Sequence, residues 1–105
     1  MEKMRLVALV DMPSSTRHER KVKREFEEWL FKSGFYQLQL GVYTRLTNGR
    51  SSADLYESRL RANQPETGMV RLFAMTEKQF REGALIAGTE QSQENEIGSQ
   101  LDIFL

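Results

Sequence analysis

Three stretches of the chain carry hydrophobic patterns that are typical of β-strands. Residues 4–10, MRLVALV, form an apolar run bounded by Asp11 and a proline, which predicts a central strand covered on at least one face. Residues 35–46, FYQLQLGVYTRL, alternate and are rich in aromatic and β-branched residues. Gly41 in their middle predicts a bend that divides this run into two strands. Residues 69–75, MVRLFAM, predict a further strand.

Between these runs, the first helical pattern follows the first strand. Ser14, Ser15 and Thr16 are good N-cap residues, so a helix should begin here. It should run to about residue 33, where Gly34 occupies the usual C-terminal glycine position. The inward face of this helix is predicted from apolar residues at helical spacing, namely Val22, Phe26, Trp29 and Leu30.

Two further helical segments are marked by the spacing of a capping box. Ser51 with Asp54 three residues later predicts that the second helix begins at residue 51 or 52, and it should end before Pro65. Thr76 and Gln79 repeat the same spacing, so the segment TEKQF should form a short helical turn.

The C-terminal part of the chain predicts small terminal strands around an acidic loop. Residues 84–87, ALIA, lie between two glycines and have the pattern of a short strand. Residues 89–99 are polar and acidic, which favours a mobile loop. The final segment LDIFL, residues 101–105, predicts a last strand. That strand could pair with an edge of its own sheet or with the sheet of a partner protomer.

The order of these elements predicts the fold class. A strand, a helix, two strands, a helix and a strand, followed by small terminal strands, indicate an α+β sandwich of the ferredoxin-like type. Its antiparallel sheet would carry two helices on one face and the terminal strands at the edge. The length of 105 residues fits a single domain over residues 1–105, and dimerisation would help so small a core by burying more apolar surface.

Charge is balanced overall but unevenly distributed. The chain has 15 Lys and Arg and 15 Asp and Glu, so its net charge is zero. Residues 1–81 hold all fifteen basic residues against ten acidic ones, a balance of +5, whereas residues 82–105 hold five acidic residues and no basic ones. The body is therefore basic and the tail acidic, so zero net charge does not exclude a nucleic-acid partner.

Composition narrows the chemistry further. Cysteine is absent, which excludes disulfides, thiolate zinc sites and cysteine nucleophiles. His18 is the single histidine, which argues against a multi-histidine metal cage and against a Ser-His-Asp triad. No apolar run approaches the roughly 18 residues of a membrane span, so no membrane partner is expected. The N-terminal stretch has the pattern of a strand rather than a signal peptide, and a cytoplasmic protein is the simplest inference.

Asp11 is the first residue that could carry chemistry. It ends the first predicted strand, and strand ends are common ligand sites in open sheets. A carboxylate there can hold a hard cation such as magnesium. One carboxylate is too few for a dedicated cage, but a two-fold axis near Asp11 would supply two, and magnesium could then bridge to phosphate and activate water. The alternative is an aspartate that caps the turn through a hydrogen bond to the backbone.

The start of the first predicted helix is the second candidate. Arg17, Arg20 and Arg24 recur at three- and four-residue spacing opposite the apolar face, and Lys21 flanks them. The dipole at a helix start prefers anions, so cations placed there favour a phosphate partner, which arginine binds well. The alternative is a solvated helix face with local ion pairs. Four further arginines could extend a basic surface: Arg45, Arg50, Arg59 and Arg61.

Several segments together resemble a known family. MRLVALVDMP, SSTRHERKVKREFEEWLFKSGF and QLQLGVYTRL resemble the first half of CRISPR-associated Cas2 proteins. RANQPETGMVRLFAMTEKQF with the terminal LDIFL resembles the variants that accompany a single large effector nuclease, in type II systems. The likeness covers nearly the whole chain, and its specificity comes from the ordered set Asp-Met-Pro, Gly-Phe, Val-Tyr and Thr-Glu-Lys-Gln-Phe.

The resemblance implies a fold, partners and a role. The fold would be ferredoxin-like, and the protein would be a homodimer whose terminal strand completes the partner's sheet. It would lie between copies of the CRISPR integrase subunit and help to hold a double-stranded spacer-precursor DNA at fixed length. Some family members are magnesium-dependent nucleases on RNA or DNA, and their aspartate matches Asp11. In others the role is structural.

Three functions therefore compete. The first is a homodimeric scaffold for spacer acquisition, with phosphate contacts from Arg17, Arg20 and Arg24. The second is a magnesium-dependent endoribonuclease or endonuclease that uses Asp11 of both protomers. The third is a ferredoxin-like regulatory module that binds a metabolite or another protein.

Overall fold

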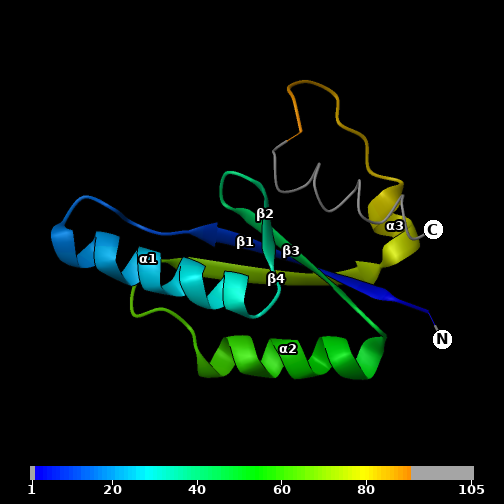
Figure 1. Cartoon of the computed structure of the whole chain (residues 1–105), viewed down its shortest axis with the longest axis horizontal. Coiled ribbons are helices and arrows are strands. Elements are labelled where there is room, and N and C mark those ends of the chain that lie inside the picture. The colour runs from blue at the N-terminus through cyan, green and yellow to red at the C-terminus, as the bar shows by residue number, and fades with distance from the viewer. Residues whose placement is uncertain (1, 91–105) are drawn as a thin grey trace.

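The chain alternates strands and helices in the predicted order (Figure 1). The structure is a computed structural model and describes residues 2–90. Its elements are β1 (Met4–Asp11), α1 (Arg17–Lys32), β2 (Tyr36–Gln39), β3 (Val42–Thr47), α2 (Arg50–Ala62), β4 (Met69–Thr76) and α3 (Glu77–Arg81). The strands predicted from the hydrophobic pattern are confirmed as β1 to β4, including the division of the long central run at Gly41.

The four strands form one sheet in the order β2-β3-β1-β4, and all neighbouring strands are antiparallel. Within residues 2–90, β1 and β3 therefore lie inside the sheet, and β2 and β4 form its edges. β4 pairs regularly with β1 over eight positions, ending with Asp11 opposite Met69. β2 has only four residues, and its pairing with β3 shifts register between Gln37 and Gln39. The sheet with its helices confirms the predicted α+β, ferredoxin-like class.

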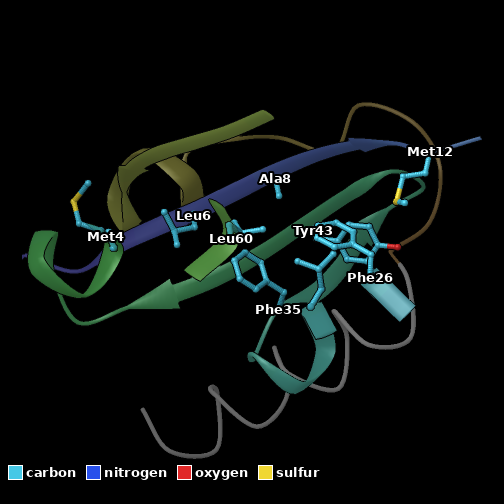
Figure 2. Close-up of a cluster of buried hydrophobic side chains, with 10 residues drawn as sticks. Met4, Leu6, Ala8, Met12, Phe26, Phe35, Tyr43 and Leu60 are labelled. Atoms are coloured by element: carbon cyan, nitrogen blue, oxygen red, sulfur yellow. The ribbon is translucent and has the colours of Figure 1, made fainter. Parts of the chain in front are cut away.

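One face of the sheet is covered by α1 and α2. Leu6 and Ala8 of β1 are buried in a cluster with Phe26 of α1, Tyr43 of β3 and Leu60 of α2 (Figure 2). Side chains alternate between the two faces of a strand, so the even-numbered residues of β1 build this core. The apolar stripe predicted for the first helix is confirmed as the inward face of α1.

Among the residues that the structure describes, α3 and the segment after it lie over part of the opposite face of the sheet (Figure 1). By the alternation of side chains this face carries the odd-numbered residues of the two paired strands, and we call this surface the open face: Val7, Leu9, Asp11, Met69, Arg71 and Phe73. The strand register places Leu9 opposite Arg71 and Val7 opposite Phe73. α3 and the segment after it lie on this side of the sheet, beyond the end of β4 (Figure 1).

The ends of α1 follow the predicted signals. The Thr16 side chain accepts a hydrogen bond of 3.0 Å from the Glu19 backbone, and the Glu19 carboxylate accepts one of 2.9 Å from the Thr16 backbone. This reciprocal capping box fixes the first turn. At the other end Gly34 has a φ of +87°, a conformation that side-chain-bearing residues rarely adopt. The helix therefore stops where the sequence predicts.

The start of α2 differs from the prediction. The helix begins at Arg50 with Gly49 as its N-cap, and no side chain caps it. The Gly49 carbonyl already accepts the first helical hydrogen bond, 3.0 Å from the Ala53 backbone. Ser51 therefore lies inside the first turn, so the predicted Ser51–Asp54 capping box is wrong. The corresponding box of α3, between Thr76 and Gln79, is confirmed.

The predicted strand at residues 84–87 is also wrong. These residues form no strand, and Ile86 is 91 % exposed. α3 carries the chain off the end of β4, and within residues 2–90 no strand runs beside this segment to complete a ladder. The predicted strand at residues 101–105 and most of the predicted acidic loop, residues 91–99, lie outside the described residues.

A buried ion pair fastens α3 to the sheet. Arg5 of β1 is 5 % exposed, and its guanidinium donates hydrogen bonds of 2.8 and 2.6 Å to the two carboxylate oxygens of Glu77. The same guanidinium lies 4.4 Å from the centre of the Phe80 ring. These contacts explain how the middle strand tolerates a buried arginine. No helix among residues 2–90 is both long and apolar enough to cross a membrane.

Candidate functional site

Asp11 lies at the end of β1 and is exposed. Its position in the alternation places it on the open face, opposite Met69 of β4. Within residues 2–90 its carboxylate accepts no hydrogen bond, so the turn-capping alternative lacks the bond on which it depends. The described part of the chain contains no group of three or more His, Cys, Asp or Glu residues that could hold a metal, so it forms no ready-made magnesium cage around Asp11.

The backbone at the end of β1 is held from both sides. The Val10 backbone donates a hydrogen bond of 2.7 Å to the Gly41 carbonyl, in the turn between β2 and β3. On the other side Gly68 has a φ of +92°, and a Cβ built on it would come within 2.8 Å of the Asp11 carbonyl oxygen. Contact of this closeness requires glycine. The two turns therefore fix the position from which Asp11 projects.

Large apolar side chains share the open face with Asp11. Leu9, Phe73 and Met69 are 40, 48 and 62 % exposed. At the α3 end of the same face, a hollow of about 610 Å³ is lined by residues that include Val7, Phe80 and Leu85. Solvated apolar side chains gathered on one surface are typical of a protein interface. Asp11 therefore lies at the margin of a surface suited to association.

The four basic residues predicted on the first helix are all exposed, but their surroundings differ. Arg20 folds back, and its guanidinium donates to the carbonyls of Ser14 and Ser15 at 3.3 and 3.1 Å. Lys21 lies 4.0 Å from the Glu25 carboxylate. For Arg17 and Arg24 the described residues provide no hydrogen bond or ion pair. Arg17 and Arg24 are thus the members of this set whose guanidinium groups are free to meet a phosphate.

The structure does not bring Asp11 and these arginines into one pocket. α1 belongs to the helix layer, whereas Asp11 projects from the other side of the sheet. The loop of residues 12–16 connects the two, so they lie near the same end of the molecule on different surfaces (Figure 1). Any ligand contacting Arg17 and Asp11 together must therefore pass around this end, or must contact two protomers.

Arg45 does not extend the basic surface, contrary to the expectation from the sequence. Its guanidinium lies 4.0 Å from the centre of the Tyr56 ring and donates a hydrogen bond of 2.7 Å to the Tyr56 hydroxyl. It also fills the space above Gly34, where a Cβ would come within 1.7 Å of Nη1. Arg59 lies 5.1 Å from the centre of the same tyrosine ring. Arg45 therefore links α2 and β3 to the end of α1.

Packing shifts the pKa values of Tyr43 and Glu77. Burial and the hydrogen bond that the Tyr43 hydroxyl donates to Glu27 raise the pKa of Tyr43, which stays protonated in the core. For Glu77, burial acts to raise the pKa, but the hydrogen bonds and charge of Arg5, helped by Arg81, outweigh it and lower the pKa. Both perturbations serve packing rather than the surface around Asp11.

Arg71 is a residue of this surface that the sequence reasoning did not single out. It is exposed on the open face, between Met69 and Phe73 on β4 and opposite Leu9. A signal exists in the sequence, because an arginine at an odd position of the strand MVRLFAM shares a face with Met69 and Phe73. It could be connected with Asp11 only through the register of β1 with β4.

Comparisons with known proteins find relatives that match nearly the whole chain. No family model matches the chain. The chain is 33 % identical over 102 residues to the CRISPR-associated endoribonuclease Cas2 of Acidovorax ebreus, covering 96 % of this chain and 100 % of that protein. It is 34 % identical to the protein of the same name from Streptococcus mutans, covering 97 and 93 %, and 31 % identical to that from Flavobacterium psychrophilum, covering 94 and 86 %.

Proposed function

Because the chain belongs to the CRISPR-associated Cas2 family, we propose that it is a CRISPR adaptation protein. In this proposal it acts as a homodimeric scaffold that binds double-stranded spacer-precursor DNA together with the integrase subunit. The observation that carries the scaffold role is the pair of arginines on α1, Arg17 and Arg24, which have no hydrogen bond or ion pair within residues 2–90, together with exposed apolar side chains on the opposite face of the sheet.

The open face supports association through a two-fold axis. In a two-fold interface the same patch of both chains is buried, so the patch must match itself. Leu9, Met69 and Phe73 are hydrophobic side chains on a sheet, and packing two such sheets face to face would remove them from water. Burial of this kind is worth roughly 25 cal/mol for each Å² of apolar surface. The helix layers would then lie on the two outer sides of the dimer, with their arginines facing solvent.

The outward α1 helices support a phosphate contact. Arg17 and Arg24 lie seven residues apart, which places them two helical turns apart on one side of α1. Duplex DNA carries one negative charge for about every 1.7 Å of its axis, so a row of cations on a rigid helix matches it without reading sequence. Zero net charge of the chain predicts modest binding by the dimer alone and stronger binding with the integrase subunit.

The scaffold role is tested by removing the two free arginines. The variant Arg17→Ala/Arg24→Ala, assembled with the integrase subunit, should bind the duplex more weakly. The slope of log affinity against log salt should become shallower by about 0.9 for each phosphate that the variant no longer neutralises. Fluorescence anisotropy over a salt series measures both quantities.

The matched control removes the same charge from other surfaces. Lys3→Ala/Lys78→Ala takes two exposed cations from the α3 end of the sheet and should leave affinity and salt slope near those of the unmodified protein. Equal losses in the two variants would show a general charge effect and reject the α1 contact. An unchanged slope in the α1 variant would reject it as well.

A magnesium-dependent endonuclease is the second candidate function, and Asp11 favours it. Its carboxylate is exposed and free of hydrogen bonds within residues 2–90, and it lies on the face through which we propose that the protein dimerises. Two copies of Asp11 near a shared axis, completed by water, would suit magnesium, which would supply an activated water for attack on a phosphodiester. The chain's own contribution is to hold each carboxylate at a fixed strand end.

The two roles separate in the variant Asp11→Asn. A nuclease should lose cleavage of RNA or DNA in magnesium or manganese while its circular dichroism stays native. A scaffold should retain spacer acquisition in cells with the same variant. Absence of metal-dependent cleavage by the unmodified protein would reject the enzymatic role and leave the scaffold role standing.

A further inference from the structure

Arg71 is a cation in an apolar setting. Its neighbours on the open face are Leu9 directly opposite and Met69 and Phe73 two residues away along β4. The side chain is exposed, and within residues 2–90 it has no hydrogen bond, ion pair or aromatic contact. The other arginine on this face, Arg5, donates two hydrogen bonds to Glu77. The packing among residues 2–90 therefore gives the Arg71 guanidinium no partner.

Dimerisation through the open face would change the surroundings of Arg71. Covering Leu9, Met69 and Phe73 would also cover the guanidinium between them. An unpaired charge taken out of water is strongly unfavourable, whereas a charge paired with good geometry is tolerated. The interface that we propose therefore requires a carboxylate for each Arg71.

Asp11 is the carboxylate in reach. It lies on the open face opposite Met69, so it is diagonal to Arg71 in the β1–β4 ladder, at a separation of about 7–8 Å for such positions. The monomer forms no ion pair between them. Both side chains stand away from the sheet, toward the surface of an apposed copy. A two-fold axis that brings Asp11 of one chain to Arg71 of the other makes the reciprocal pair as well.

We propose that Arg71 of each protomer forms an ion pair with Asp11 of its partner across the dimer interface. The proposal rests on the homodimer of the proposed function and adds its charge specificity. Two such pairs fix how one sheet is oriented on the other, which apolar contacts alone do not. They also engage the Asp11 carboxylates, so a metal at this position must displace a guanidinium.

The test uses two charge-reversal variants that can form opposite-charge pairs only with each other. Arg71→Asp leaves aspartate at both positions, and Asp11→Arg leaves arginine at both. Each variant alone would place like charges in contact twice, so its dimer should dissociate roughly 100-fold more readily than the unmodified dimer. An equimolar mixture places opposite charges in contact twice, so the heterodimer should form at near the unmodified affinity. Sedimentation and native mass spectrometry of differently tagged chains measure the three species.

The outcomes are distinguishable. A heterodimer no tighter than the two homodimers overturns the cross-interface pair. The doubly exchanged variant Asp11→Arg/Arg71→Asp tests for a pair within one chain. If this variant forms a homodimer while the mixed chains form only a weak heterodimer, the ion pair lies within one chain, which also overturns the proposal. Circular dichroism checks the fold, and Arg71→Glu with Asp11→Lys repeats the experiment if either first variant fails to fold.

Failure of this inference differs from failure of the proposed function. If the unmodified protein is a dimer and the mixture shows no preference, the ion pair is wrong and the scaffold remains. If the unmodified protein sediments as a monomer at micromolar concentration, the homodimer itself is wrong. Duplex binding through α1 is measured separately, because Arg17 and Arg24 lie in the helix layer.

Discussion

Replacing Glu77 by alanine removes the partner of a buried cation. Arg5 is 5 % exposed and donates two hydrogen bonds to the Glu77 carboxylate, at 2.8 and 2.6 Å. Without the carboxylate, the contact with the Phe80 ring is what the described residues still offer the Arg5 guanidinium. Breaking a fully buried ion pair by removing one partner costs about 3–5 kcal/mol. The Glu77 side chain is still 13 % exposed, so the lower end, about 3 kcal/mol, is expected.

Urea unfolding with linear extrapolation measures this loss as a lower midpoint with little change in slope. Glu82→Ala is the matched control, because it removes an equal charge from an exposed residue at the end of α3. It should change the free energy of unfolding by less than about 0.5 kcal/mol. The double variant Arg5→Met/Glu77→Leu removes both charges and should recover most of the stability, since apolar residues can replace a buried pair.

The reasoning is wrong if Glu77→Ala costs no more than Glu82→Ala. Such a result would mean that Arg5 reaches water once its partner is removed. A double variant as unstable as Glu77→Ala would instead attribute the loss to packing of α3 rather than to an unpaired charge.

Four further changes have defined outcomes. Folding lowers the pKa of Glu77, so the ionised Glu77 carboxylate stabilises the folded protein fully above its ordinary pKa of 4.5. This contribution is lost as the pH falls through the pKa of Glu77 in the folded protein. The difference in free energy of unfolding between the unmodified protein and Glu77→Gln, measured by urea titration, should therefore become smaller at acid pH. Leu30→Ala, at 0 % exposure, should cost about 2–5 kcal/mol in the same assay. Gly34→Ala should cost about 2 kcal/mol, because φ is +87° and Arg45 occupies the Cβ position; a cost near zero would contradict the strain. Phe73→Asp should abolish the dimer in sedimentation while circular dichroism stays native, and an intact dimer would contradict the open-face interface.

The local features of the fold could be predicted because their causes are local. The capping box of Thr16 with Glu19 and the glycine at residue 34 each depend on residues within one turn, and both ends of α1 lie where the sequence places them. The start of α2 was missed because Gly49, which has no capping side chain, takes the N-cap position ahead of Ser51. Both Gly49 and Ser51 are possible N-cap residues, and the helix begins after Gly49, whose carbonyl accepts the first helical hydrogen bond.

Features that depend on residues far apart in the chain could not be predicted from the local hydrophobic pattern. The burial of Arg5 depends on Glu77, 72 residues away, so no window of sequence predicts that this arginine is internal. Residues 84–87 have a strand-like composition, but a strand needs a neighbour, and composition does not supply one. The two charged residues of the open face, Asp11 and Arg71, differ in how far the sequence predicts them, for the same reason. Asp11 follows from its place at a strand end, whereas Arg71 joins it only through the β1–β4 register. The magnesium ion, the type II assignment and the cytoplasmic location stay predictions.

The two margins of the sheet are unequal, and this limits how copies of the protein can add to one another. β2 is four residues long and its pairing is irregular, so its outer side offers few aligned hydrogen-bonding groups to an incoming strand. β4 presents eight regularly spaced residues, and within residues 2–90 no strand pairs with its outer side. A fibre that grows without limit by strand addition needs two sheet edges on each molecule that can pair with another strand. A molecule with one such edge can pair through it once, so strand addition ends in an assembly with a fixed number of chains.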